Sequence, residues 1–231
     1  MNLLAFLAGY WLDLVAVIVI AAATWMISSF LSRKRTKILM GIANQLGFAF
    51  GGDDWSHGGR APLFDTPLFE RSRQKVFRNI MAGSRAGLDS SFFDYSFGRG
   101  RHSTQQTLAT FSQDSWLPLF EISPNNVMRK VGDAILRKNI RIESHPIFSS
   151  RFQLRSSEEE KIRALLTPGL LTHLESLDPS MKWHVEGCGP TLVIYRLGKI
   201  VKPDEFAAFV ENTTAIAKAF FTFSGLKTFR T

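Results

Sequence analysis

The feature that most constrains this chain is an uncharged run of eighteen residues, Leu14 to Leu31. As a helix rising about 1.5 Å per residue it would cover roughly 27 Å, close to the hydrocarbon core of a bilayer, which is about 30 Å thick. A helix packed on a soluble core would show a polar face at 3.6-residue spacing, and this run shows none. The run therefore predicts a transmembrane helix, so the rest of the chain has to fold beside a membrane.

The residues before the run place its outer end. Tyr10 and Trp11 are amphipathic rings suited to the headgroup level, so we expect the outer interface near residues 10–13, with Asp13 at the rim. A cleaved signal peptide is the alternative, because residues 21–23 are three alanines that resemble a cleavage site. No Lys or Arg precedes Arg33, however, and the apolar run continues past the alanines. We therefore expect an uncleaved span.

Basic residues follow the span at once and predict its orientation. The positive-inside bias places the N-terminus outside and the residues from 33 onward in the cytoplasm. Each basic residue near an anionic leaflet adds about 1 kcal/mol of attraction, so the cluster can also hold the juxtamembrane segment on the lipid surface. We prefer a role in topology alone to specific lipid recognition. We expect a transmembrane anchor with a basic flank over residues 1–35 and one cytosolic domain over 36–231. The flanking basic residues are Arg33, Lys34, Arg35 and Lys37.

The charge of the chain is unevenly distributed. The net charge is +8, and residues 71–101 alone carry +5, which makes them the one basic block away from the span. A single cysteine, Cys188, excludes an intrachain disulfide and a multi-cysteine metal site. This composition agrees with a reducing compartment.

The first half of the domain reads as a helix followed by strands. An apolar stripe predicts a helix over 36–48 that continues from the membrane helix, and residues 62–69 read as an extended loop whose Leu and Phe side chains cap the core. Phe93 and Tyr95 alternate with polar residues, which predicts that they point inward, against Phe209 of the last helix. The expected strands are 76–82, 88–97, 104–112 and 117–122, separated by Gly- and Ser-rich turns.

The second half alternates helices with short strands. Ser123 should cap a helix that begins at Pro124, and Thr167 another that begins at Pro168. The other expected elements are a strand pair at 140–143 and 148–154, a helix from about 158, a hairpin of 183–186 with 191–196, and a last helix over 203–221. The order predicts an α+β fold, in which an N-terminal transmembrane helix is followed by an antiparallel sheet with helices packed on one face. Residues 36–97 and 157–196 share this pattern but too few residues to establish an internal duplication.

Short motifs along residues 42–221 resemble a family of uncharacterised bacterial single-pass membrane-anchored proteins. The resemblance implies a protein of the bacterial inner membrane with a cytosolic domain of unknown function, and it brings no catalytic residues. The motifs that carry it are Phe93-Asp94-Tyr95, Gln106-Thr107, Leu117-Pro118-Leu119-Phe120-Glu121, His145-Pro146-Ile147-Phe148-Ser149, Val185-Glu186-Gly187 and Lys202-Pro203.

No catalytic, metal or cofactor motif stands out. The five histidines lack the spacing of a shared metal face, and the GxSxG elbow and the nucleotide-binding glycine patterns are absent. His145, before Pro146, suits a turn or a chain cap. Asp94 should face solvent on the outer side of the sheet. If that side is covered, Asp94 needs a partner such as Arg99 or Arg101, since an unpaired buried carboxylate is costly.

The basic block 71–101 combines arginines with aromatic residues, as RNA-binding sheets do, but it lacks the spacing of an RNA-binding motif. Core packing explains the rings, and tethering near lipid makes an anionic membrane or an acidic protein a better partner for the arginines than nucleic acid. The residues that we expect at the membrane surface are Arg33, Lys34, Arg35, Lys37, Arg71, Arg73, Arg99 and Arg101.

Two classes of function follow from these observations. The first is a membrane-tethered interaction or regulatory module, which needs no catalytic motif. The alternative is an enzyme with an unrecognised site, acting on an acidic or lipid-derived substrate. A deep pocket with converging polar groups would favour the enzyme, and an exposed basic or apolar patch would favour the module.

Overall fold

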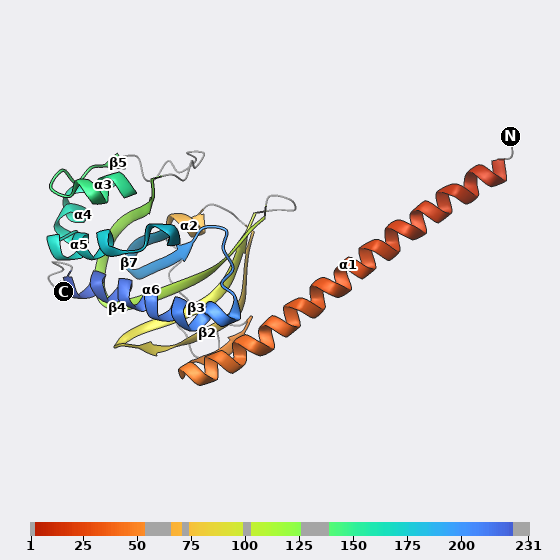
Figure 1. The fold of residues 1–231 in the computed structure, drawn as a ribbon, viewed down its shortest axis with the longest axis horizontal. Coiled ribbons are helices and arrows are strands. Elements are labelled where there is room, and N and C mark those ends of the chain that lie inside the picture. Colours follow the sequence, from red (N-terminus) through yellow and green to blue (C-terminus); the bar gives the residue numbers. More distant parts are fainter. Residues whose placement is uncertain (1–2, 54–65, 71–73, 99–102, 126–138, 224–231) are drawn as a thin grey trace.

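The computed structural model describes residues 3–53, 66–70, 74–98, 103–125 and 139–223. Helix α1 (Leu3–Leu46) runs without a break from the N-terminal end into the domain, and most of its length projects away from the rest of the molecule (Figure 1). By length and composition it contains a segment that could cross a membrane, and this segment is the only one of its kind in the described ranges. The helix expected at 36–48 is confirmed as the continuation of the apolar helix.

Among the described residues the domain is built on a seven-stranded sheet in which every pairing is antiparallel, as predicted. The strand order is β1-β2-β3-β4-β6-β5, and β7 pairs with the free edge of β4. The short turns between successive strands explain the meander β2-β3-β4. The strands are β1 (Ala49–Gly52), β2 (Lys75–Arg85), β3 (Leu88–Phe97), β4 (Thr104–Pro124), β5 (Asn139–Ile140), β6 (Phe152–Ser156) and β7 (Trp183–Arg196).

The two long strands β4 and β7 correct the prediction in two places. The strands expected at 104–112 and 117–122 are one strand, and the hairpin expected at 183–196 is the single strand β7, paired with β4 along both halves. The glycines bend this ribbon instead of reversing the chain. Gly187 lies so close to Phe120 that an added Cβ would be 2.3 Å from the ring, and Gly189 has a φ of +57°.

The predicted N-cap of α5 is confirmed. Thr167 accepts a hydrogen bond from the Leu170 amide at the start of α5, at 3.4 Å. Residues 148–151, expected in a strand, belong to a helix because Pro146 suits the first helical turn. The helices are α2 (Pro67–Glu70), α3 (Pro146–Arg151), α4 (Glu159–Leu165), α5 (Pro168–Ser176) and α6 (Phe206–Phe223), with short 3₁₀ turns η3 (Pro179–Met181) and η4 (Pro203–Glu205).

The helix predicted to follow Ser123 is not capped there. Ser123 and Pro124 are the last residues of β4 and pair with Gln153 and Phe152 of β6. The apolar stripe expected at 127–136 lies outside the described residues.

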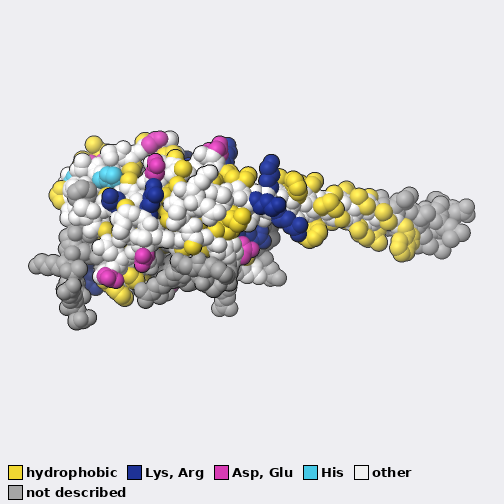
Figure 2. Space-filling model, turned by 90° about the horizontal axis from the view of Figure 1, so that it is seen from below, with side chains coloured by type: hydrophobic (Ala, Val, Ile, Leu, Met, Phe, Trp, Pro, Cys, Tyr) yellow, Lys and Arg dark blue, Asp and Glu magenta, His cyan; other side chains and the backbone are white. Residues whose placement is uncertain are grey.

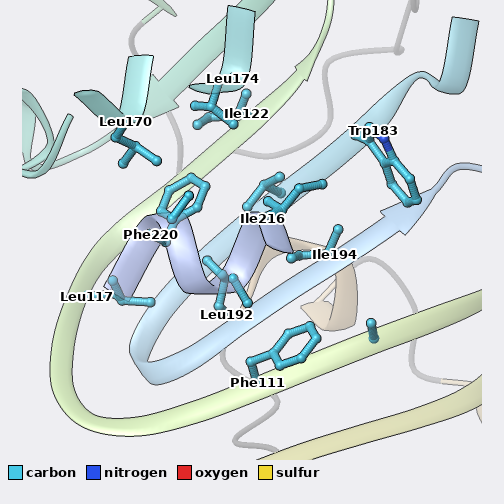
Figure 3. Packing of buried hydrophobic residues seen from close by; sticks show 14 of the residues in the cluster. Phe111, Leu117, Ile122, Leu170, Leu174, Trp183, Leu192, Ile194, Ile216 and Phe220 are labelled. Atoms are coloured by element: carbon cyan, nitrogen blue, oxygen red, sulfur yellow. The ribbon is translucent and has the colours of Figure 1, made fainter. Parts of the chain in front are cut away.

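The larger core lies between the sheet and the helices α5, α6 and the lower end of α1 (Figures 1 and 3). Phe92 of β3 packs against Phe206 and Phe209 at ring-centroid distances of 6.4 and 6.3 Å. Leu39 and Ala43 of α1 are fully buried in the same core. The helix that leaves the domain is therefore also one of its core elements.

The opposite face of the sheet is covered as well, which overturns one predicted contact. Phe93 and Tyr95 are buried there, against Leu68 and Phe69 of α2, and not against α6. Phe92 makes the contact with Phe209 that we expected of Phe93. Both faces are apolar, so the period of two could not show which of them faces α6. Of the extended loop expected at 62–69, residues 62–65 lie outside the described residues, and the part from Pro67 onward is the short helix α2 instead. Its Leu68 and Phe69 cap this second core as predicted.

Candidate functional site

The junction between α1 and the sheet is held by an ion pair. Asp94 of β3 lies on the side of Phe92 and meets Arg35, which stands four residues beyond the uncharged run of α1. Arg35 Nε donates to Asp94 Oδ2 and Nη2 donates to Oδ1, both at 2.8 Å. Arg35 Nη1 also donates to the carbonyl oxygen of Val201 at 2.8 Å. One side chain thus ties α1 both to β3 and to the segment before η4.

Two further side chains donate hydrogen bonds to the Asp94 carboxylate. Asn79 Nδ2 donates to Oδ2 and the Thr107 hydroxyl donates to Oδ1, each at 2.8 Å. Thr36 of α1 donates to Asn79 Oδ1 at 2.7 Å, so a second α1 residue joins the network. The side chains of Arg35 and Asp94 are only 19% and 12% exposed. A pair that is shielded to this degree interacts more strongly than a surface salt bridge.

An irregularity in β2 brings Asn79 into this network. Arg78 pairs with Asp94 and Met81 pairs with Phe92, so two residues of β2 stand opposite Phe93 alone. Asn79 has a φ of +53°, a left-handed conformation that Asn tolerates better than most residues. This bulge turns the Asn79 amide towards Asp94.

The junction corrects the interpretation of Asp94. We expected it to be exposed, or paired with Arg99 or Arg101 if covered. Its side of the sheet is covered, and its partner is Arg35, which is 59 positions away in the sequence. Sequence reasoning had assigned Arg35 to the membrane surface with its basic neighbours. An acidic residue between aromatic residues of a strand was the available signal, but nothing in the sequence named its partner.

The other predicted surface residues divide into two groups. Arg33, Lys34 and Lys37 are exposed on α1, and Figure 2 shows basic side chains gathered where the apolar helix meets the domain. The second group lies outside the described residues and consists of Arg71, Arg73, Arg99 and Arg101.

A shallow groove of about 260 Å³ lies beside the ion pair, between α1 and the strands β2 and β3. Arg78, directly across the ladder from Asp94, is exposed at this groove, and no described residue pairs with its guanidinium. We refer to this site as the junction groove. Its lining residues are Ser28, Leu31, Ser32, Arg35, Val76, Arg78, Asn79, Asp94, Tyr95, Ser96, Gln105 and Ile200.

A second polar group is buried where the β4–β7 ribbon bends. Glu121 and Glu186 stand opposite each other in the strand register, and both are at most 1% exposed. Glu186 accepts hydrogen bonds from the Tyr195 hydroxyl and the Leu68 amide, and the Tyr195 ring stacks on His184 at 5.0 Å. Sequence reasoning missed this group. It is closed to solvent and ties α2 to the sheet, so it acts as a polar part of the core.

Elsewhere among the described residues, histidine and acidic side chains hold the fold together and do not form a metal site. His145 precedes α3, and its Nδ1 lies 3.3 Å from Glu175 Oε1 of α5, in line with the expectation that it holds a turn. Within the described ranges, no three His, Cys, Asp or Glu side chains are grouped so that they could hold a metal ion.

The fold and the junction together define an α+β domain that is locked onto the end of a single long apolar helix. Its fold is similar to that in the crystal structure of the mycobacterial trehalose monomycolate transport factor A, TtfA, with a TM-score of 0.58. The match covers 81% of this chain and 93% of that chain at 9% sequence identity. At this identity the likeness shows a shared fold. No family model matches the sequence, and no curated protein matches it.

Proposed function

We propose that this protein is a membrane-anchored accessory module. In this proposal α1 crosses the bacterial inner membrane once, with the N-terminus outside, and holds the domain at the cytoplasmic face in a fixed orientation. The observation that carries the proposal is the junction of Arg35 with Asp94 and Val201. A flexible linker would be enough for tethering alone. An unbroken helix that is locked to the sheet also fixes which surface of the domain a partner meets.

The position of the junction along α1 supports contact with the leaflet. If residues 14–31 fill the hydrocarbon core, Arg35 lies about 6 Å beyond Leu31 at 1.5 Å per residue. The polar layer of a bilayer leaflet is roughly 5–8 Å deep, so the junction would lie among the headgroups. The exposed Arg33 and Lys34 lie within the same layer, Lys37 follows at about 9 Å beyond Leu31, and all three favour an anionic leaflet.

The burial of a group of titratable side chains favours a binding function over the enzymatic alternative. Glu121, Glu186 and His184, which lie together, are at most 1% exposed and offer a substrate no access. The junction groove is shallow and lies at the membrane end of the domain. The similar fold belongs to a protein described as a transport factor, and an accessory role beside a membrane process agrees with our proposal. Its cargo does not carry over to this chain.

Two measurements on the full chain test the proposal. A reporter fused after Thr231 should be active only in its cytoplasmic form, and activity of a periplasmic reporter there would overturn the orientation. Proteins that co-purify after crosslinking in membranes should be recovered with the wild type and with Asp89→Asn, an exposed change in β3. Asp94→Asn should lower that recovery several-fold while the protein stays in the membrane. Equal recovery would show that a fixed orientation is not required.

A further inference from the structure

We propose that the junction groove binds the headgroup of an anionic phospholipid, with Arg78 as the ligand of its phosphate. This inference rests on the proposed function, because it needs α1 to cross the membrane along residues 14–31. Under that condition the groove lies at the boundary between the hydrocarbon core and the headgroups, since its lining on α1 runs from Ser28 and Leu31, at the end of the uncharged run, to Ser32 and Arg35 beyond it. A lipid of the adjoining leaflet can then enter it from the side.

The charge of the groove favours an anion. Asp94 is saturated, because its two oxygens accept four hydrogen bonds and its charge is matched by Arg35. Arg78 is therefore left as the second cation of the groove, exposed and without an ion-pair partner in the described part of the chain. Two arginines against one carboxylate leave a positive site, and a guanidinium is well suited to bind phosphate oxygens.

The other residues that line the groove offer both apolar surface and hydrogen-bond donors, and a phospholipid needs both. Leu31 and Val76 are 58% and 45% exposed, and they offer apolar contact beside the end of the membrane-spanning run. Hydroxyl and amide groups that can donate hydrogen bonds come from Ser32, Ser96 and Gln105. Pockets that enclose a whole small molecule usually measure roughly 300–1,000 Å³. The groove measures about 260 Å³, which suits a headgroup whose acyl chains stay in the bilayer.

Lipid retention by the full chain tests this inference. The protein is purified in mild detergent, mixed with equal amounts of phosphatidylglycerol and phosphatidylcholine, and analysed by native mass spectrometry. The wild type should retain phosphatidylglycerol in preference. Arg78→Glu should weaken that binding about tenfold, because it reverses a charge at the phosphate. Ser96→Trp, which fills the groove without changing its charge, should reduce retention of both lipids.

The matched control is Arg141→Glu, which makes the same charge change on an exposed residue beside β5, at the far end of the domain from α1 (Figure 1). It should retain phosphatidylglycerol as the wild type does. Equal retention of the two lipids, or equal losses in Arg78→Glu and Arg141→Glu, would overturn the inference. Displacement by millimolar glycerol phosphate would overturn it too, because the groove would then bind a soluble phosphate compound. These failures leave the reporter and crosslinking results of the proposed function unchanged, whereas failure of the proposed function changes at least one of those two results.

Discussion

Neutralising Asp94 is the sharpest test of the junction. Asp94→Asn keeps the size of the side chain and leaves the Arg35 guanidinium, 19% exposed, without a counter-ion. Removing one partner of a fully buried ion pair costs about 3–5 kcal/mol, and a hydrogen bond to a charged group is worth about 1.5–3 kcal/mol. Because this pair is partly exposed, we expect a loss of about 2–3 kcal/mol. For a domain of this size that lowers the melting temperature by roughly 4–12 °C.

The assay is thermal unfolding of the full chain in detergent, followed by near-ultraviolet circular dichroism. Asp89→Asn is the matched control, since it makes the same change on an exposed residue of β3 and should stay within about 0.5 kcal/mol of wild type. The double variant Arg35→Gln/Asp94→Asn should recover at least about 1 kcal/mol relative to the sum of the single changes. Equal melting temperatures of Asp94→Asn and Asp89→Asn would refute the reasoning. So would a loss of stability in the double variant that equals the sum of the losses in the two single variants.

Three further predictions concern the fold. Phe92→Ala should destabilise the full chain by about 3–5 kcal/mol in chemical denaturation, because the ring is fully buried against α6; a loss no larger than that of the exposed Val76→Ala would contradict this core. Gly187→Ala should cost about 1–3 kcal/mol through its clash with the buried Phe120 ring, whereas Gly41→Ala, in an exposed position of α1, should be neutral or stabilising in the same assay. The hydrogen bond from Lys161, aided by the Leu119 amide, holds the pKa of Glu158 below its ordinary value. Glu158 therefore stabilises the fold above about pH 4.3, and this contribution is lost as the pH falls through the lowered pKa. Glu158→Gln should accordingly lower the melting temperature at pH 7 and have little effect near pH 3, and an equal effect at both values would exclude this role.

Much of the fold follows from local patterns in the sequence. The uncharged run, the Gly-bounded strands β2 and β3, the Thr167 cap and the stripe of α6 each depend on neighbouring residues, and each is found where it was expected. The errors in the predicted fold concern which strands pair with each other. Gly187 and Gly189 read as a turn, but a glycine pair serves equally well at the bend of a long strand. The partner strand β4 decides between the two, and its register is not a local property.

The candidate site could not be predicted from the sequence either, because it also depends on contacts between residues that are far apart in the chain. Asp94 was identified as a residue that needs a partner if covered, and Arg35 was identified as a basic residue next to the membrane. Joining them requires the fold, because the bulge at Asn79 and the course of α1 bring them together. The faces of β3 were ambiguous because both are covered, so that Phe92 and Phe93 look alike in an alternating pattern.

The continuity of α1 has a consequence for the order in which the protein matures. The helix is made first, whereas the carbonyl group that Arg35 binds belongs to Val201, 166 positions later. During synthesis the span can therefore be in the bilayer while the junction is still open, and the nascent domain is free to swivel. The orientation becomes fixed only when nearly the whole chain has been made. Under the proposed function, a truncated or stalled product would be anchored in the membrane but would present no defined face to a partner.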